Sequence, residues 1–175
     1  GLVAYGFNCY ASIYLFLKNS RRVRLTDRKN ILKFYREHSL DELPVVTTQL
    51  PVFNEANCVE RLIEAVCAMD YPKDKHEIQV LDDSTDECYE VTKRKVAEMQ
   101  ACGYDIKLIH RTIRKDYKAG ALKEGMVVAR GNFLAIFDAD FVPEKDFLLK
   151  TIPYMVMDEQ VGLVQGRWGH LNRME

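Results

Sequence analysis

The sequence has few of the features that mark disulfide-stabilised, zinc-bound or fibrous proteins. Its five cysteines are an odd number and contain no Cys-x-x-Cys pair, so neither a disulfide framework nor a zinc ribbon is supported. Reduced thiols in a cytosolic compartment are the simplest interpretation. Nine glycines and five prolines among 175 residues, without an internal repeat, exclude a fibrous or low-complexity chain.

An excess of charge of either sign is also missing. The 25 lysines and arginines nearly balance the 26 aspartates and glutamates, and a net charge of −1 argues against a dedicated nucleic-acid-binding protein. The four histidines are scattered, which gives little support to a histidine metal cluster. The absence of a Gly-x-x-x-x-Gly-Lys segment excludes a P-loop enzyme. Hydrophobic residues at 47% and charged residues at 29% are typical of a packed globular protein.

Long uncharged runs are confined to residues 1–17, which are followed at once by Lys18, Arg21, Arg22 and Arg24. A spanning helix needs about 20 apolar residues. Because the chain starts with Gly rather than Met, we expect a fragment of a longer protein that begins in the end of a transmembrane helix. The basic cluster then places the following domain on the cytoplasmic side. A buried or interfacial amphipathic helix is the alternative.

Beyond this stretch, strand and helix patterns alternate. We divide the chain into residues 1–25, a polar helix and linker over 26–44, and a main domain over 45–175. Strands are predicted over 45–50, 77–81, 106–109, 133–137 and 161–165, and helices over 55–69, 86–101, 118–130 and 144–156. Asn54 is the predicted N-cap of the first of these helices. This alternation predicts an α/β fold, with a mostly parallel sheet and helices on both faces.

The helix faces follow from the spacing of apolar residues. In 55–69 the residues expected to face the core are Val59, Leu62, Ile63, Val66 and Cys67. In 118–130 the residues in phase are Ala119, Leu122, Met126 and Val127. In parallel sheets of this kind, ligands bind at the carboxyl ends of the strands. The polar clusters of this sequence lie where that rule places a site.

Asp138 and Asp140 carry the sharpest signal, because they directly follow the buried run 133–137. Two carboxylates one residue apart at a strand end can share a hard divalent cation, Mg²⁺ or Mn²⁺. An Asp pair in a turn or a helix cap is the structural alternative.

Two further clusters lie at other strand ends. Asp82 and Asp83 follow the second strand, where they can cap a helix or accept hydrogen bonds from a base or a ribose. The basic segment 110–121 opens a helix, and a diphosphate there would meet Lys118 and free backbone N–H groups. Phe53 follows the first strand and could stack on a flat base or belong to the core. Together these features indicate a site for a nucleoside diphosphate.

Four segments, 49–55, 80–86, 117–122 and 137–141, resemble family 2 inverting glycosyltransferases, in the branch of cellulose synthase and the cellulose-synthase-like mannan and glucomannan synthases. The resemblance covers about residues 44–172. It implies a Rossmann-like GT-A fold behind a transmembrane segment. It also implies a membrane enzyme that transfers a hexose from UDP-glucose or GDP-mannose to a polysaccharide or other glycan acceptor.

The resemblance also implies residue roles. Asp83, with Asp82 beside it, would contact the base and ribose, and Phe53 and Glu55 would line the base pocket. Lys118 would approach the diphosphate. Asp140 would be the principal metal ligand, with Asp138 beside the ribose and sugar. On the sugar and acceptor side, the implied residues are Gln165, Arg167 and Trp168.

The family's acidic general base, often in a Thr-Glu-Asp motif, does not follow Trp168, and we expect it outside this fragment. The implied reaction is a single displacement with inversion, in which a carboxylate deprotonates the acceptor hydroxyl. Two other hypotheses remain from the residues: a nucleotidyltransferase with the same acidic edge, and a non-catalytic nucleotide-binding module.

Overall fold

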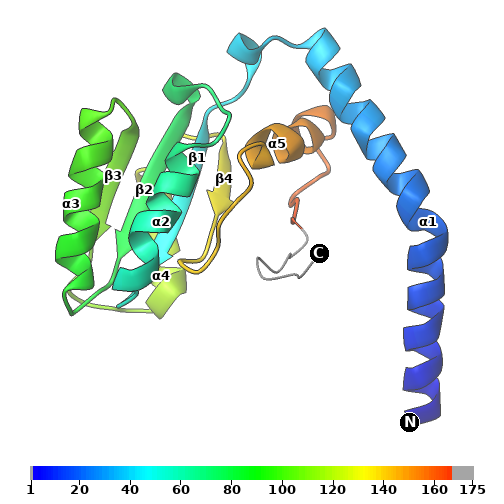
Figure 1. The fold of residues 1–175 in the computed structure, drawn as a ribbon, viewed down its shortest axis with the longest axis horizontal. Coiled ribbons are helices and arrows are strands. Elements are labelled where there is room, and N and C mark those ends of the chain that lie inside the picture. Colours follow the sequence, from blue (N-terminus) through cyan, green and yellow to red (C-terminus); the bar gives the residue numbers. More distant parts are fainter. Residues whose placement is uncertain (1, 167–175) are drawn as a thin grey trace. The chain divides into compact units, whose positions relative to one another are not determined.

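The computed structural model describes residues 2–166, and the side chains of all of these except residues 2–4, 21 and 24. The chain divides into two compact units. The first contains residues up to 39 together with 153–164, and the second contains residues 40–152 with 165 and 166. Figure 1 shows the order of the elements along the chain.

The first unit is built on α1 (Leu2–Glu37), a helix of 36 residues. In its first half, large apolar side chains are exposed to solvent, namely Tyr5, Phe7, Tyr10, Ile13, Tyr14, Leu15, Phe16 and Leu17. None of the described helices is long and apolar enough to cross a membrane. Helix α1 continues through the expected boundary at residue 25, so the segment 26–44 contains its last turns and the short helix η1 (Leu40–Glu42).

The second unit alternates strands and helices as the sequence predicts. Its elements are β1 (Val46–Val52), α2 (Ala56–Cys67), η2 (Lys73–Lys75), β2 (His76–Asp82), α3 (Cys88–Ala101), β3 (Asp105–His110), α4 (Tyr117–Val127), β4 (Phe133–Ile136) and the start of α5 (Phe147–Met157). Each of the first four predicted strands is present, with ends shifted by one or two residues. The four helices are present as well.

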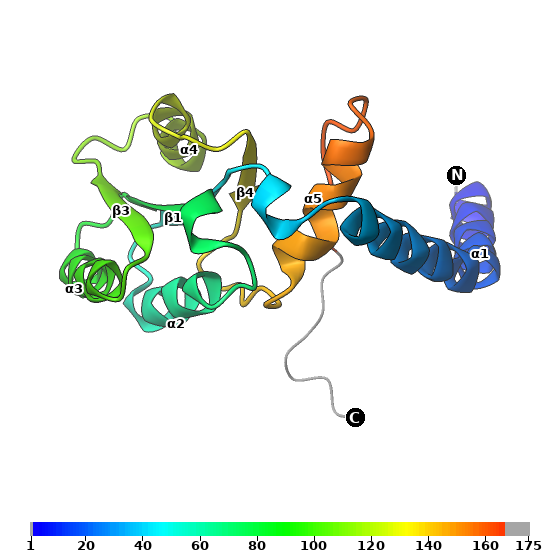
Figure 2. The same ribbon diagram turned by 90° about the horizontal axis from the view of Figure 1, so that it is seen from above.

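The four strands form one parallel sheet in the order β3-β2-β1-β4. Helices cover both faces, with α2 and α3 on one side and α4 on the other (Figure 2). The fold class predicted from the sequence is therefore confirmed for this unit. Because every strand runs in the same direction, the segments that follow β1, β2, β3 and β4 all leave the sheet at one edge.

The face of the sheet under α2 and α3 carries most of the apolar core. The five residues predicted to face the core from α2 are all buried: Val59, Leu62, Ile63, Val66 and Cys67. They pack with buried strand residues such as Leu50, Ile78, Val80 and Ile106 in a continuous core. Burial of these side chains is the main source of the unit's stability.

The face under α4 is different, and the predicted apolar side of α4 is wrong. Met126 and Val127 are exposed, whereas Gly120, Ala121 and Gly125 are buried. A Cβ at Gly125 would lie 2.6 Å from Nε2 of Gln49, so the helix approaches the sheet through its small residues. The strands present polar side chains there, and Gln49 donates a hydrogen bond from Nε2 to Oε1 of Gln79.

The predicted strand over 161–165 is also wrong, since residues 161–166 form no strand. Its β-branched and apolar composition was the only signal for it. A strand forms only where a neighbour accepts and donates its backbone hydrogen bonds. Within the described part of the chain, residues 161–166 pair with no strand of the sheet.

Candidate functional site

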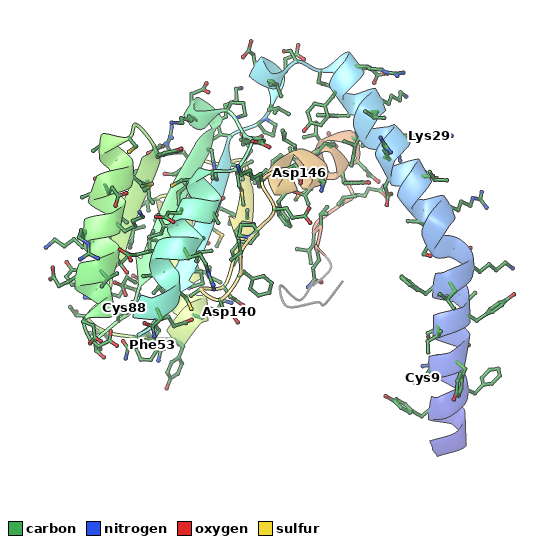
Figure 3. The ribbon with its side chains drawn as sticks, in the orientation of Figure 1. Cys9, Lys29, Phe53, Cys88, Asp140 and Asp146 are labelled. Atoms are coloured by element: carbon green, nitrogen blue, oxygen red, sulfur yellow. The ribbon has the colours of Figure 1, made fainter. Side chains whose placement is uncertain are left out.

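A cleft of about 320 Å³ lies at the carboxyl edge of the sheet. It is lined by residues from three strand ends and from the start of α4, namely Pro51, Val52, Phe53, Glu55, Leu81, Asp83, Arg114, Lys118, Ala121, Asp138, Ala139 and Asp140. Phe53 and Asp140 appear near this end of the sheet in Figure 3. The structure thus brings together six of the residues predicted from the sequence: Phe53, Glu55, Asp83, Lys118, Asp138 and Asp140.

Three carboxylates form the acidic side of the cleft. Asp138 and Asp140 flank Ala139, which is buried. Partial burial raises the pKa of Glu55, and the negative charges of Asp140 and Asp138 raise it further, while Lys118 opposes them. Glu55 therefore lies within the electrostatic field of the aspartate pair, on the acidic side of the cleft.

These residues fit a divalent cation that arrives with a phosphate ligand. Among the described residues, no group of three or more His, Cys, Asp or Glu side chains is arranged to hold a metal ion on its own. Mg²⁺, however, is usually held by one or two carboxylates plus the substrate's phosphates. Two aspartates, Asp138 and Asp140, provide such oxygen ligands at this cleft.

Lys118 forms the basic side of the cleft. It stands in the first turn of α4, which begins at Tyr117, and its Nζ donates a hydrogen bond to Oδ1 of Asp138. Both side chains of this ion pair are about half exposed, 49% for Lys118 and 47% for Asp138. An exposed ion pair contributes little to stability. A helix N-terminus also favours anions through its backbone N–H groups and its dipole.

A second feature of the cleft is a planar cation over an aromatic ring. The guanidinium carbon of Arg114 lies 3.3 Å from the ring centroid of Phe53, a close cation–π contact. The Nε atom of Arg114 lies 3.7 Å from Oδ2 of Asp83. Phe53 and Arg114 both line the cleft, so an aromatic face and a side chain with several hydrogen-bond donors lie together there.

Asp83 forms a buried, bidentate ion pair. Its Oδ1 accepts a hydrogen bond from Nε of Arg111 at 2.7 Å, and its Oδ2 accepts one from Nη2 at 2.6 Å. The side chains are only 4% exposed for Asp83 and 5% for Arg111. The hydrogen bonds to Asp83 are the largest cause of a raised pKa of Arg111, so the guanidinium keeps its charge.

Asp82 is fully buried and does not line the cleft. Its Oδ1 accepts a hydrogen bond from the backbone N–H of Ser84 at 2.7 Å. Its Oδ2 has no hydrogen-bond partner and lies 3.9 Å from Nδ1 of His110. This position supports the turn after β2, and the predicted contact of Asp82 with a base or ribose stays a prediction.

Asn54 does not cap α2, which corrects the sequence-based expectation. The N-cap position belongs to Glu55, and no side chain caps the helix there. Asn54 has a left-handed backbone with φ of 53° and joins the loops after β1 and β2. Its Oδ1 accepts a hydrogen bond from the N–H of Thr85, and its own N–H donates to Oγ of Ser84.

The predicted acceptor side is not assembled by the described residues. Gln165 is exposed and does not line the cleft, and Arg167 and Trp168 lie outside the described residues. Conversely, Arg111 and Arg114 were not predicted as site residues. Both follow β3, which lies next to β2 in the parallel sheet, and that position could have identified them.

Comparison with known proteins agrees with this geometry. Residues 49–172 match the family described as Glycosyl transferase family 2. A probable glucomannan 4-beta-mannosyltransferase 3 from Oryza sativa subsp. japonica is 45% identical over 140 residues, which cover 75% of this chain and 25% of the relative. Glucomannan 4-beta-mannosyltransferase 9 from Arabidopsis thaliana is 40% identical over 164 residues, which cover 87% of this chain and 31% of the relative.

A solved structure is similar as well. A mannosyltransferase from Pyrobaculum calidifontis, in complex with GDP-Man and Mn²⁺, superimposes with a TM-score of 0.59 at 27% identity, covering 77% of this chain and 42% of that one. The chain spans only about a quarter to a third of the length of the two plant relatives. The family match covers most of the chain and includes all six residues that the cleft brings together. The chain therefore belongs to glycosyltransferase family 2.

Proposed function

We propose that this chain is the donor-binding part of a mannosyltransferase that uses GDP-mannose and a divalent metal to extend a β-linked glycan with inversion. The observation that carries the proposal is that one cleft brings together an aromatic face, a lysine from the first turn of a helix and a pair of aspartates that follows a strand. The names of the plant relatives and of the archaeal mannosyltransferase favour mannose over glucose.

Each group in the cleft has a distinct task. Phe53 offers a flat apolar face on which the base can stack once the guanidinium of Arg114 moves aside or slides over the base. Lys118 exchanges its ion pair with Asp138 for the donor's diphosphate, which the exposure of that pair permits. The first turn of α4 adds backbone N–H groups on the same side.

The aspartates would bind the metal ion that offsets the negative charge of the diphosphate. Asp140, with Asp138, would bind Mg²⁺ or Mn²⁺ together with the diphosphate oxygens. When bound, the metal supplies stabilisation of the negative charge that develops on the departing diphosphate. Lys118 would stabilise the same charge, which favours cleavage of the bond between the sugar and the diphosphate.

The membrane location and the glycan acceptor are part of the same proposal. The exposed apolar and aromatic side chains in the first half of α1 support contact with a membrane, and the basic residues that follow support a cytoplasmic position for the second unit. A glycan acceptor follows from the names of the plant relatives.

A donor-resolved transfer assay tests the function. The full-length protein, in membranes, is incubated with labelled GDP-mannose, UDP-glucose or a nucleoside triphosphate, each with and without Mn²⁺, and with glucomannan oligosaccharides. The proposal expects mannose transfer from GDP-mannose, dependent on the metal, in a β-linkage read by NMR. Transfer of a nucleotidyl group, or sugar transfer that does not need a metal, would refute it.

A further inference from the structure

Arg111 connects the three parts of the second unit that surround the basic side of the cleft. Its guanidinium binds Asp83 at the end of β2 through two hydrogen bonds. It also donates to the backbone carbonyl oxygens of Lys115 at 3.2 Å and Tyr117 at 2.9 Å, and to Oε1 of Glu124 in α4 at 3.3 Å. Arg111 itself is buried and does not line the cleft.

The carbonyls that Arg111 binds belong to a strained turn. Asp116 and Tyr117 both have left-handed backbones, with φ of 57° and 49°, which is unfavourable for residues other than glycine. Lys115 precedes this pair and Tyr117 is its second member, so the guanidinium holds the turn at both ends. Such a conformation persists only where surrounding contacts fix it, and Arg111 supplies those contacts.

Gly120 completes the arrangement. A Cβ at this position would lie 2.1 Å from the carbonyl oxygen of Lys115 and 2.8 Å from Nη1 of Arg111. Only glycine allows the loop and the guanidinium to close onto the first turn of α4. The strained turn, the arginine and the glycine therefore act as one unit, and Lys118 follows this unit directly in the chain.

We propose that Arg111, anchored by Asp83, is a positioning residue that fixes the 111–118 loop so that Lys118 faces the donor's diphosphate. The inference rests on the proposed function of the cleft. Asp83 anchors this guanidinium through both of its carboxylate oxygens. The consequence is graded. Lys118 meets the diphosphate, while Arg114 of the same loop lies over Phe53, so loss of the anchor should weaken binding of the diphosphate more than binding of the base.

Titration calorimetry on the full-length protein tests this difference, with GDP and Mn²⁺ compared with guanosine. Arg111→Lys keeps the charge beside Asp83 but cannot bind two carboxylate oxygens and two carbonyls at once. We expect GDP affinity to fall about tenfold to a hundredfold, since charge-assisted contacts of the diphosphate are lost. Guanosine affinity should fall by a smaller factor, because there only the contact of Arg114 with Phe53 is affected. Arg94→Lys, which alters an exposed ion pair with Glu60 on α2, is the matched control and should change neither.

Gly120→Ala disturbs the same arrangement of turn, arginine and glycine without changing any charge. It keeps the test decisive if an Arg111 variant is poorly folded. It should reproduce the larger loss of GDP affinity. A double-mutant cycle adds a second check: in a Lys118→Ala background, Arg111→Lys should cause little further loss, because the two act on the same contact.

Three results would overturn the inference. Equal losses for GDP and guanosine would mean a general structural role, and additive losses in the cycle would mean that Arg111 acts independently of Lys118. Unchanged GDP affinity in both Arg111→Lys and Gly120→Ala would remove the role altogether. If the wild-type protein binds neither GDP nor GDP-mannose with Mn²⁺, the proposed function fails, and the inference fails with it.

Discussion

Two ion pairs near the cleft each join a basic residue of the 111–118 segment to an aspartate that follows a strand. They differ in geometry and in burial. Arg111–Asp83 is bidentate and almost wholly buried, whereas Lys118–Asp138 is a single contact with both side chains about half exposed. A buried pair cannot exchange partners without leaving a charge unpaired, while an exposed pair can. The buried pair therefore maintains the scaffold, and the exposed pair is available to a ligand.

The comparison extends to the other end of the sheet. There, Glu77 is fully buried and accepts hydrogen bonds from Oγ1 of Thr47, Nζ of Lys107 and the backbone N–H of Arg130. These bonds hold the pKa of Glu77 below its usual value despite burial. Glu77, at the amino end of β2, thus resembles the Arg111–Asp83 pair and not the exchangeable Lys118–Asp138 pair.

The largest expected effect comes from the acidic side of the cleft. Asp140→Asn keeps the size of the side chain but removes a charged oxygen ligand, and mannose transfer should fall by about 10²–10³-fold. The measurement is the transfer rate across a range of Mn²⁺ concentrations. Stability should be nearly unchanged, because Asp140 is exposed. A variant with the wild-type Mn²⁺ dependence would contradict the assignment of Asp140 as a metal ligand.

The two ion pairs should differ clearly in how much each contributes to the free energy of unfolding. Asp83→Ala leaves a buried guanidinium without its partner and should lower the free energy of unfolding by about 3–5 kcal/mol. Asp138→Ala removes an exposed partner and should cost about 0–1 kcal/mol. Urea denaturation of both variants measures the difference. Similar losses in the two variants would abolish the distinction between scaffold and exchangeable pair.

We expect the loss of stability in acid to come largely from His76, which is buried at the amino end of β2. Burial lowers the pKa of His76 to about 4, from an ordinary value of about 6.5. The unfolded chain therefore protonates at His76 at a higher pH than the folded protein does. The contribution of His76 to stability is fully present above about pH 6.5 and decreases as the pH falls. By pH 4 this one group should cost about 3 kcal/mol.

His76→Gln is the control for that prediction, because glutamine can still bond to Oγ1 of Thr48 but does not titrate. Denaturation at a series of pH values should show a shallower decline in the variant. An equal decline in both proteins would assign the acid sensitivity to other groups.

The smallest effect on ligand binding is expected at the aromatic face. Phe53→Leu keeps an apolar side chain but removes the ring, and base–aromatic stacking is worth about 1–3 kcal/mol. Affinities for guanosine and GDP should therefore fall by the same factor, about tenfold. This pattern is the opposite of that expected for Arg111→Lys. A loss for GDP alone would show that Phe53 does not contact the base.

The sequence allowed prediction of the elements that depend on local pattern and of the sites that follow strand ends. Asp138, Asp140, Glu55 and Phe53 could be grouped because parallel strands deliver their carboxyl ends to one edge. Arg111 could not be linked to Asp83, because that contact depends on β2 and β3 being neighbours in register. The pairing of Asp82 with His110 places the next two residues side by side.

Two errors have the same physical origin, which is tertiary context. The apolar phase of α4 suggested that Met126 and Val127 face the core, but close approach to a polar sheet face is possible only through Gly125 and its small neighbours. The β-branched run at 161–165 had the propensity of a strand without a partner strand. Periodicity records which residues are apolar, and it does not record what they pack against.

The central claim is that one cleft binds a nucleoside diphosphate sugar between an exchangeable lysine and a metal-binding aspartate pair. Calorimetric titration of GDP-mannose into the full-length protein tests it most directly, with and without Mn²⁺, in wild type and in Lys118→Ala. We predict one binding site whose affinity falls at least about tenfold on removal of the metal and again in the variant. Binding of equal strength without Mn²⁺ and without Lys118 would contradict the account.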